Sequence, residues 1–129
     1  IVFDEEKATN FSCIYIDVNE LHIINNKFGH AAGDEMLIYI ANTLKEVFYG
    51  HNIYRMGGDE FLVLCKGIDE KIFRDKVEVL RKDMQEKQAN MSLGCVWRDS
   101  IVDVEAMIIE ADGLMYEEKR AYYATRGNN

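Results

Sequence analysis

The sequence predicts an α+β fold in which a mainly antiparallel central sheet is flanked by helices. Three observations predict it. Short apolar runs typical of strands lie between longer stretches whose apolar residues recur at helical spacing. Two of the short runs are joined by a segment with two glycines, which is typical of an antiparallel hairpin. The order of strand, helices, hairpin, helix, strand and helix suits one sheet with helices covering a face.

The first half of the chain supplies a strand and then helices. Residues 11–17 (FSCIYID) are apolar and rich in β-branched and aromatic side chains, which predicts a buried strand ending in the carboxylate of Asp17. The segment 25–34 combines two glycines with Asn and Asp, and this composition predicts a loop joining two helices. The second helix is expected after Gly33, where apolar residues recur at helical spacing: Leu37, Ile40, Ala41, Leu44, Val47 and Phe48.

The second half supplies the hairpin, a further strand and two helices. Residues 52–56 and 61–65 are joined by Gly57-Gly58-Asp59-Glu60, and we expect these glycines to take the positive φ values of a primed turn. Residues 90–97 alternate as a strand does, with Met91, Leu93, Cys95 and Trp97 on one side.

Asp69 and Asp103 are expected to cap the two helices. The apolar sides of these helices are Ile72, Phe73, Val77, Leu80 and Met84 in the first, and Met107, Ile108, Ala111, Leu114 and Met115 in the second. Tyr116 and Trp97 are also expected in the core.

The composition is that of one ordinary soluble domain. The chain has 129 residues, a hydrophobic share of 48% and a charged share of 29%, and it lacks proline, repeats and low-complexity segments. We therefore expect residues 1–129 to form a single domain. Because residue 1 is Ile rather than Met, we expect that domain to be a fragment of a longer protein.

Charge and cysteine usage narrow the class of partner and the compartment. The net charge of −8 argues against a nucleic-acid backbone or an anionic membrane as the main partner, but it allows a nucleotide carried with Mg²⁺. No apolar run approaches the length of a membrane span. Cys13, Cys65 and Cys95 lie in apolar stretches without the paired spacing of a zinc site, so buried reduced thiols and a cytoplasmic location are predicted. Membrane anchoring of a full-length protein stays open.

Three carboxylates stand apart from core and surface. Asp17 ends an otherwise apolar strand, and Asp59 and Glu60 lie at the tip of the expected hairpin. Taken singly, Asp17 suits a strand end or the cap of the next helix, and the other two suit a solvated turn. If the hairpin lies beside the first strand, the three converge at one edge of the sheet, where Mg²⁺ would relieve their repulsion. Phosphoryl-transfer enzymes stabilise the reacting phosphate in this way, so a candidate Mg²⁺ nucleotide site is predicted.

The segment between these acids offers an amide and a carboxylate. Asn25 and Asp34 suit a guanine edge, which needs a donor to O6 or N7 and an acceptor for N1–H and the N2 amine. The alternative is that Asn25 is a loop residue and that Asp34 merely complements the dipole at a helix start.

Three motifs stand out along the chain: RMGGDEF at residues 55–61, DVNELHIINNKFGH at residues 17–30 with Gly33 and Asp34, and Ala111-Asp112 with Met115-Tyr116 and Lys119. In this order and spacing they resemble the motifs of the GGDEF family of diguanylate cyclases. The first contains the family's signature intact, the second resembles its metal-and-guanine segment, and the third resembles its C-terminal helix motif. The resemblance covers Phe11 to about Tyr123, and it implies a ferredoxin-like, palm-like nucleotide cyclase fold.

The resemblance implies an enzyme, a nucleotidyltransferase that condenses two GTP molecules into cyclic di-GMP and two pyrophosphates. In each step a ribose 3′-hydroxyl would attack the α-phosphate of a second GTP. One GTP would be bound by each subunit of a homodimer, and a regulatory or sensory region in the same full-length chain would control the encounter of the two subunits.

The resemblance also implies roles for individual residues. Mg²⁺, with Mn²⁺ as the alternative ion, would be bound by the carboxylates of Asp17 and Asp59 and the backbone carbonyl of Val18. Glu60 would be a further metal ligand or an acid–base participant, and Asp59 would help to deprotonate the attacking hydroxyl. The remaining substrate contacts would be Gly57 and Gly58, which let the backbone approach the phosphates, Asn25 and Asp34 on guanine, and His22 and Lys119 on the phosphates.

The chain departs from the family pattern at four places. His22 stands where a phosphate-binding lysine is frequent, and contact with phosphate and a half-exposed helix position are equally good interpretations of it. Asn26 replaces a frequent aspartate, and Tyr123 stands where many members have a phosphate-binding arginine. Residues 48–51 (FYGH) lack the Arg-x-x-Asp of the family's product-inhibition site.

These departures keep a second class of function open, a catalytically weak or silent domain that binds GTP and regulates a neighbouring domain. A third class, a palm-like fragment of a polymerase, is disfavoured because a template-handling protein should have a basic surface.

Overall fold

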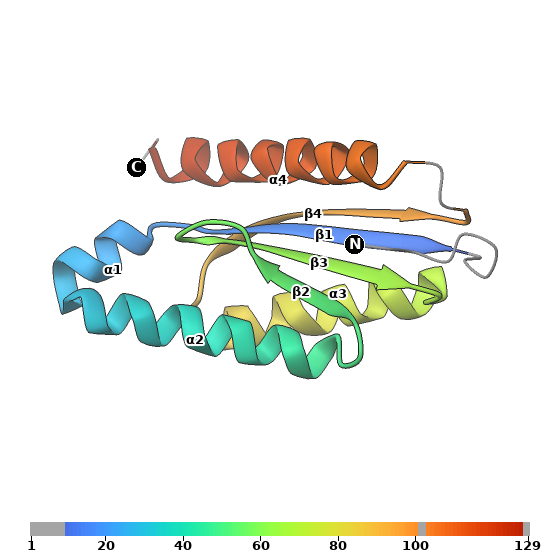
Figure 1. The fold of residues 1–129 in the computed structure, drawn as a ribbon. Coiled ribbons are helices and arrows are strands. Elements are labelled where there is room, and N and C mark those ends of the chain that lie inside the picture. The colour runs from blue at the N-terminus through green and yellow to red at the C-terminus, as the bar shows by residue number, and fades with distance from the viewer. Residues whose placement is uncertain (1–9, 101–102, 128–129) are drawn as a thin grey trace.

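The apolar run near the N-terminus forms strand β1 (Phe11–Val18), and every one of its residues is buried. β1 lies inside a four-stranded sheet of order β2-β3-β1-β4, with β2 (Asn52–Arg55), β3 (Glu60–Lys66) and β4 (Met91–Arg98) (Figure 1). All neighbouring strands run antiparallel, so the predicted fold class is confirmed. The structure is a computed structural model that describes residues 10–100 and 103–127.

Four helices occupy the described part of the chain: α1 (Leu21–Phe28), α2 (His30–Val47), α3 (Glu70–Glu86) and α4 (Val104–Gly127). Figure 1 shows α4 on one face of the sheet, α2 and α3 on the other, and α1 beyond one end of the strands. Among the residues with described placement, none of these helices has both the length and the apolar character needed to cross a membrane.

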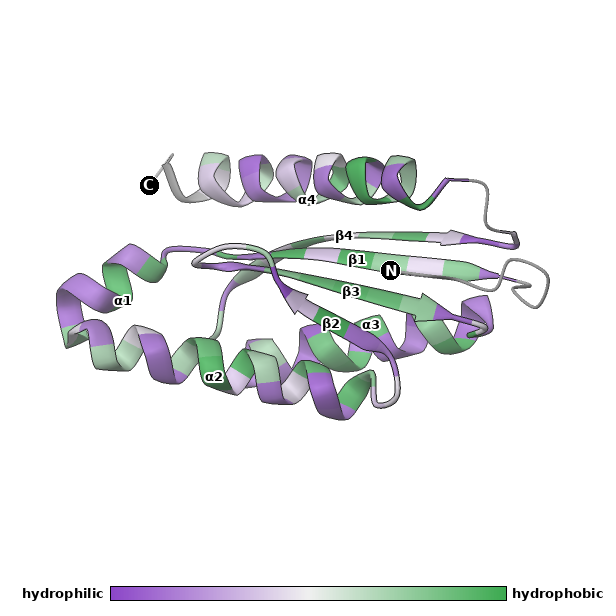
Figure 2. Ribbon diagram, viewed as in Figure 1, coloured by the Kyte–Doolittle hydropathy of each residue, from purple (hydrophilic) through white to green (hydrophobic). Residues whose placement is uncertain are grey.

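Alternation along the strands separates two apolar cores. On β1, Ile14 and Ile16 face α2 and α3, whereas Cys13 and Tyr15 face α4. In Figure 2 the strands are largely hydrophobic, and hydrophilic and hydrophobic residues alternate along the helices on either side of them. Burying each large apolar side chain contributes roughly 1.5–3 kcal/mol, so both cores stabilise the sandwich.

The α1–α2 junction is tighter than the sequence predicts. The expected loop over 25–34 is wrong, because α1 runs to Phe28, α2 begins at His30, and Gly29 alone separates them. Gly29 has φ 92° and ψ 163°, a conformation that glycine reaches without a side-chain clash and that turns the chain within one residue. The predicted apolar side of α2 is otherwise confirmed, with Leu37, Ile40 and Leu44 buried.

The β2–β3 hairpin also differs from its predicted form. Neither Gly57 nor Gly58 takes a positive φ, so the primed turn is wrong. The loop is longer than a two-residue turn, since Met56 N–H donates to Glu60 O at 2.9 Å and residues 57–59 span the tip. A wider loop reverses the chain without left-handed residues.

The caps of α3 and α4 are confirmed. Asp69 accepts a hydrogen bond from Lys71 N–H at 3.1 Å, and Asp103 accepts one from Ala106 N–H at 3.1 Å. Three residues assigned to buried positions are exposed: Ile72 at 52%, Leu114 at 41% and Tyr116 at 59%. The apolar stripes of the helices run one position away from each, through Phe73 and Met115.

α4 packs against β4 at backbone distance. A Cβ added at Gly94 would lie 2.1 Å from Ala111 O and 2.5 Å from Met115 N, so only glycine allows this approach. At the same edge, Glu118 accepts a hydrogen bond from Leu93 N–H at 2.7 Å and pairs with Arg81 at 2.7 Å.

The three thiols are free, as the sequence predicts. Cys13 and Cys65 are buried and Cys95 is half-buried. Burial raises the pKa of the first two to about 12 and of Cys95 to about 11, so all three stay protonated at neutral pH.

Candidate functional site

Asp17 and Glu60 lie opposite each other where β1 and β3 meet the hairpin tip. Both side chains are on the α4 face, since Asp17 contacts Lys119 of α4 and Glu60 contacts Tyr15 of the α4 core. Asp59 is adjacent, and its carbonyl accepts a hydrogen bond from Val18 N–H at 2.9 Å. The hairpin therefore does lie beside the first strand, as the carboxylate hypothesis requires.

Asp17 is a buried carboxylate with one oxygen paired and one orphaned. Its exposed fraction is 4%, its Oδ2 lies 2.6 Å from Lys119 Nζ, and its Oδ1 is buried without a hydrogen-bond partner. Burial, with a smaller contribution from the charge of Asp59, raises the pKa of Asp17 despite the hydrogen bond from Lys119. That hydrogen bond in turn raises the pKa of Lys119. An orphaned anionic oxygen of this kind favours a further cation.

Glu60 is held on the same face by a residue that the sequence did not single out. Tyr15 OH donates to Glu60 Oε1 at 3.3 Å, and burial together with the charge of Glu60 raises the pKa of Tyr15 to about 12. Burial and the neighbouring Asp17 charge raise the pKa of Glu60 as well. The sequence offers only one signal for this contact, which is a phenol two residues before Asp17 on the same side of the strand.

A hollow of about 570 Å³ opens beside these carboxylates. It gathers predicted site residues from β1, α1, the hairpin and α4. Its lining residues are Val18, Glu20, Leu21, His22, Asn25, Gly58, Asp59, Lys119 and Tyr123. Gly58 is open to this space, because a Cβ there would meet no atom within 4 Å. Asp17, Gly57 and Glu60 adjoin the lining residues in the chain but do not line the hollow themselves.

Asp34 faces a different hollow from Asn25. It lines a space of about 370 Å³ between α2 and the hairpin, together with Leu37, Ile38, Ala41, Arg55 and Phe61. Asn25 instead packs on Gly33, where an added Cβ would lie 1.8 Å from Asn25 Oδ1, and that oxygen is buried without a partner. The two residues are therefore neighbours across the α1–α2 contact without sharing one wall. Their joint contact with guanine stays a prediction.

Comparison with known families decides the assignment. The family model described as "Diguanylate cyclase, GGDEF domain" matches residues 3–124. The chain belongs to this GGDEF domain family. The expected resemblance is thereby confirmed over nearly the whole chain.

Two relatives show how the domain compares with longer proteins. Diguanylate cyclase VdcA of Vibrio cholerae is 28% identical over 121 residues, which cover 84% of this chain and 36% of the relative. Diguanylate cyclase DgcP of Escherichia coli is 33% identical over 119 residues, which cover 82% of this chain and 34% of the relative. The chain thus spans about a third of the length of these curated relatives.

Solved GGDEF structures agree with the fold. The active GGEEF domain of a diguanylate cyclase from Vibrio cholerae is 26% identical with a TM-score of 0.77, covering 88% of this chain and 78% of that one. The GGDEF domain of DgcB from Caulobacter crescentus, solved in complex with c-di-GMP, has a TM-score of 0.79 at 21% identity and covers 91% and 76%. At that identity the second likeness shows the fold alone.

Within this GGDEF domain the arginine before the signature has a structural task. Arg55 donates to Gly57 O at 3.2 Å and to Gly58 O at 2.6 Å, so its guanidinium holds both carbonyls of the hairpin tip. The backbone of Gly57 and Gly58 is thus held by hydrogen bonds from Arg55, and neither glycine adopts a left-handed conformation. Sequence reasoning treated Arg55 as part of the signature and did not predict this contact.

The carboxylates of this site fit a Mg²⁺ ion only if a substrate supplies further ligands to it. Within residues 10–100 and 103–127, no group of three or more His, Cys, Asp or Glu side chains is gathered closely enough to hold a metal ion by itself. Mg²⁺ is commonly bound through one or two carboxylates and completes its shell with water and substrate phosphates. The orphaned oxygen of Asp17 beside Asp59 suits that mode.

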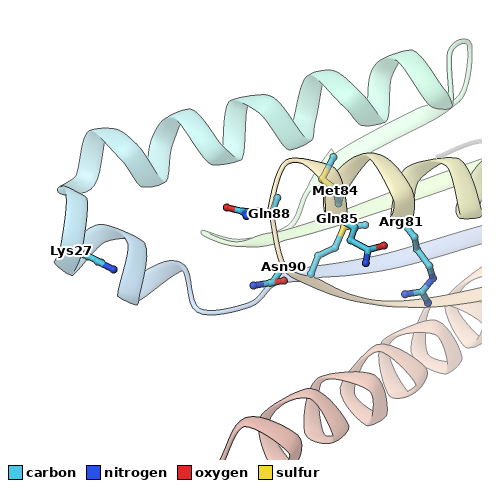
Figure 3. Close-up of a pocket in the computed structure, with 8 residues that line it drawn as sticks. Lys27, Arg81, Met84, Gln85, Gln88 and Asn90 are labelled. Atoms are coloured by element: carbon cyan, nitrogen blue, oxygen red, sulfur yellow. The ribbon is translucent and has the colours of Figure 1, made fainter.

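A larger hollow of about 760 Å³ lies away from the signature of the GGDEF domain. Figure 3 shows Lys27 of α1 across from Arg81, Met84, Gln85, Gln88 and Asn90 at the end of α3 and the loop after it. The described residues that line it include no carboxylate, and Arg81 is paired with Glu118. Volume alone therefore does not mark the functional site, whereas the smaller hollow has the charged groups.

Proposed function

We propose that this domain is a diguanylate cyclase that condenses two GTP molecules into cyclic di-GMP and two pyrophosphates. One observation carries the proposal. Asp59 of the intact signature lines one hollow with Val18, His22 and Lys119, and it interacts with buried Asp17, whose Oδ1 has no hydrogen-bond partner. Carboxylates that can hold a metal ion, with a lysine and a histidine close by, are what a metal-bound triphosphate needs.

The carboxylates would bind the metal ion and accept the proton of the attacking hydroxyl. Asp17 and Asp59, with the Val18 carbonyl, would hold Mg²⁺ or Mn²⁺, which would neutralise charge at the reacting phosphate. Asp59 would accept the proton of the attacking 3′-hydroxyl. Glu60, oriented by the Tyr15 hydroxyl at 3.3 Å, would serve as a further ligand or acid–base group.

Basic and backbone groups would hold the triphosphate. Lys119 Nζ lies 2.6 Å from Asp17 Oδ2, and we propose that it exchanges this carboxylate for a terminal phosphate. His22 is exposed on the first turn of α1 and lines the same hollow, so it is within the same space as the phosphates. Gly58 leaves room for the substrate, because a Cβ there would project into open space, and Gly57 would let the backbone approach the phosphates.

Asn25 and Asp34 would read the guanine base across the contact of α1 with α2. A site that hydrogen-bonds the guanine edge should reject adenine strongly, because the wrong base leaves buried polar groups unpaired. The condensation would need two copies of the domain facing each other, with one GTP each. The greater length of the relatives supports a regulatory region in the same polypeptide that controls this encounter.

The test is product formation by a chemically dimerised form of the chain. The dimer is incubated with GTP and Mg²⁺, and cyclic di-GMP is sought by chromatography. Asp59→Asn serves as the inactive control and ATP replaces GTP in a parallel arm. Equal binding of ATP and GTP by calorimetry would show that Asn25 and Asp34 have only structural roles.

A domain that binds GTP without condensing it is the second candidate. It is favoured by one observation, that His22 and Tyr123 stand where cations are frequent, which thins the positive charge around the hollow. His22→Lys restores one charge and should raise turnover roughly tenfold if the domain is a slow cyclase. GTP binding without product in both wild type and His22→Lys would make the silent module the better conclusion.

A further inference from the structure

The residue between β1 and α1 has an unusual backbone. Glu20 is the N-cap of α1 with φ 58° and ψ 28°, the left-handed region that residues other than glycine rarely adopt. Its side chain makes no capping hydrogen bond to the helix. Such a conformation persists only where surrounding contacts impose it, and it is concentrated at functional sites.

Two consecutive tyrosines at the end of α4 contact this residue. Tyr123 Oη accepts a hydrogen bond from Glu20 N–H at 2.9 Å, and Tyr122 OH donates to Glu20 Oε2 at 3.0 Å. The two rings meet edge to face with centroids 5.2 Å apart, and both side chains are half-buried. Backbone and side chain of Glu20 are therefore both held from an element about a hundred residues away.

The strand side of the junction is anchored separately. Asn19 N–H donates to Asn90 O at 2.9 Å, and its Oδ1 accepts from buried Ser92 Oγ at 3.0 Å. Glu20 then starts the helix, with its carbonyl accepting from Ile23 N–H at 3.0 Å and Ile24 N–H at 3.3 Å. The position of Glu20 thus sets where the first turn of α1 lies relative to the strand.

That first turn is one wall of the hollow. Glu20, Leu21 and His22 line it, and Lys119 and Tyr123 line it from the α4 side. The N-terminal turn of a helix presents free N–H groups and a partial positive charge to anions. A shift of this wall would change the part of the hollow between the first turn of α1 and Lys119, whereas the side chain of Asn25 packs on Gly33 of α2.

We propose that Tyr122 and Tyr123 are positioning residues that fix the first turn of α1 for the polyphosphate of GTP, an inference that rests on the proposed function. The Tyr123 hydroxyl holds the Glu20 backbone in this wall, and the Tyr122 hydroxyl holds the Glu20 side chain.

The experiment measures binding of four ligands that differ in phosphate number. Guanosine, GMP, GDP and the α,β-methylene analogue of GTP, whose α–β bond does not react, are titrated by calorimetry with Mg²⁺. Tyr123→Phe removes the hydroxyl and keeps the ring, and it should weaken binding of the triphosphate analogue roughly five- to tenfold. Tyr122→Phe should give the same pattern at roughly two- to fivefold. Guanosine affinity should stay unchanged in both variants.

Tyr39→Phe is the matched control. Tyr39 OH donates to Asp83 Oδ1 at 2.5 Å between α2 and α3, so this variant also loses a tyrosine–carboxylate hydrogen bond, but outside the hollow. It should bind all four ligands as the wild type does. Thermal unfolding of each variant shows whether the fold is retained.

Two outcomes would overturn the positioning role alone. The first is wild-type affinity of Tyr123→Phe for the triphosphate analogue, and the second is an equal loss for guanosine and for the analogue. A wild-type chain that binds none of the four ligands would instead overturn the proposed function, and the positioning role with it.

Discussion

The two faces of the sheet are built from the same strands but end differently. Under α2 and α3, the face is apolar to its end, where Val18 and Phe61 are buried at 2% exposure. Under α4, the face is apolar in its middle and ionic at its end, where Asp17 and Glu60 lie. Successive side chains on β1 and β3 point to opposite faces of the sheet. The apolar and the ionic residues at the strand ends are therefore direct neighbours in the chain.

The face under α2 and α3 therefore contributes mainly stability, whereas the face under α4 carries the candidate site. The ionic end costs stability, since Asp17 is buried, has an orphaned oxygen and has a pKa raised by burial. The apolar face offsets that cost through fully buried side chains such as Phe73 and Ile40. Substitutions on the two faces should therefore separate loss of activity from loss of stability.

Asp17→Asn should give the largest difference between the loss of activity and the loss of stability. Removing the buried charge should lower cyclic di-GMP formation on the order of 10³-fold, the scale for losing a charge-stabilising group in phosphoryl transfer. The unfolding temperature should stay within a few degrees of wild type, because a buried charge is removed and the Lys119 side chain, which is 32% exposed, can be solvated. Chromatography and circular dichroism measure the two effects. Near-normal turnover would contradict the division between faces.

The opposite behaviour is expected for Phe73→Ala on the α3 side. Phe73 is fully buried, and its truncation should lower the free energy of unfolding by about 3–5 kcal/mol in urea denaturation. GTP affinity of the folded fraction should not change. Ile40→Val on the same face is the milder companion, with an expected cost of about 0.5–1.5 kcal/mol. A change in nucleotide affinity without a change in stability would break the comparison.

Gly94→Ala tests how closely α4 must lie on the sheet. The new methyl would meet Ala111 O at 2.1 Å, a backbone atom that cannot rotate away, so a loss of about 1–3 kcal/mol is expected. Gly113→Ala is the matched control, because a Cβ on that α4 residue meets nothing within 4 Å and should favour the helix. Urea denaturation compares the two. Equal stability of both variants would mean that α4 shifts at little cost.

The smallest effect concerns pH on the α2 side of the molecule. Burial, with a smaller contribution from the charge of Lys76, lowers the pKa of His51. A lowered folded-state pKa contributes stability above the unfolded value of about 6.5, and this contribution is lost as pH falls through the folded-state value. Wild type should thus lose stability relative to His51→Gln between about pH 7 and pH 5, by less than about 1 kcal/mol. Parallel curves in thermal melts would contradict this.

The strands, the helix caps and the fold class follow from local patterns. The uninterrupted apolar run of β1 and the side chains of Asp69 and Asp103 signal their own structure. The α1–α2 junction does not, because Gly29 breaks the helix while Gly33 lies within the next one. Gly33 is explained only by the tertiary contact with Asn25, which no local pattern shows. Tyr116 was misplaced for a related reason, since it adjoins the buried stripe of α4 without belonging to it.

The sequence predicts several residues that the structure brings to one hollow, but not the contacts that they make. The motifs single out Asp17, Asp59 and Lys119, and the structure places Lys119 on Asp17 at 2.6 Å. Contacts made by ordinary aromatic residues were not foreseen, as with Tyr15 on Glu60 and Tyr123 on Glu20. These join positions 45 and 103 residues apart, so they depend on how the sheet and α4 pack.

The ion pair beside β4 has a consequence for solubility. β4 lies at one side of the sheet, where an unpaired strand can recruit a strand from another molecule and start aggregation. The Glu118 carboxylate accepts a hydrogen bond from Leu93 N–H at 2.7 Å, and its ion pair with Arg81 holds it there. A second strand would have to displace a charged side chain before it could add to this edge. Two copies of the domain are thereby hindered from joining edge to edge along β4.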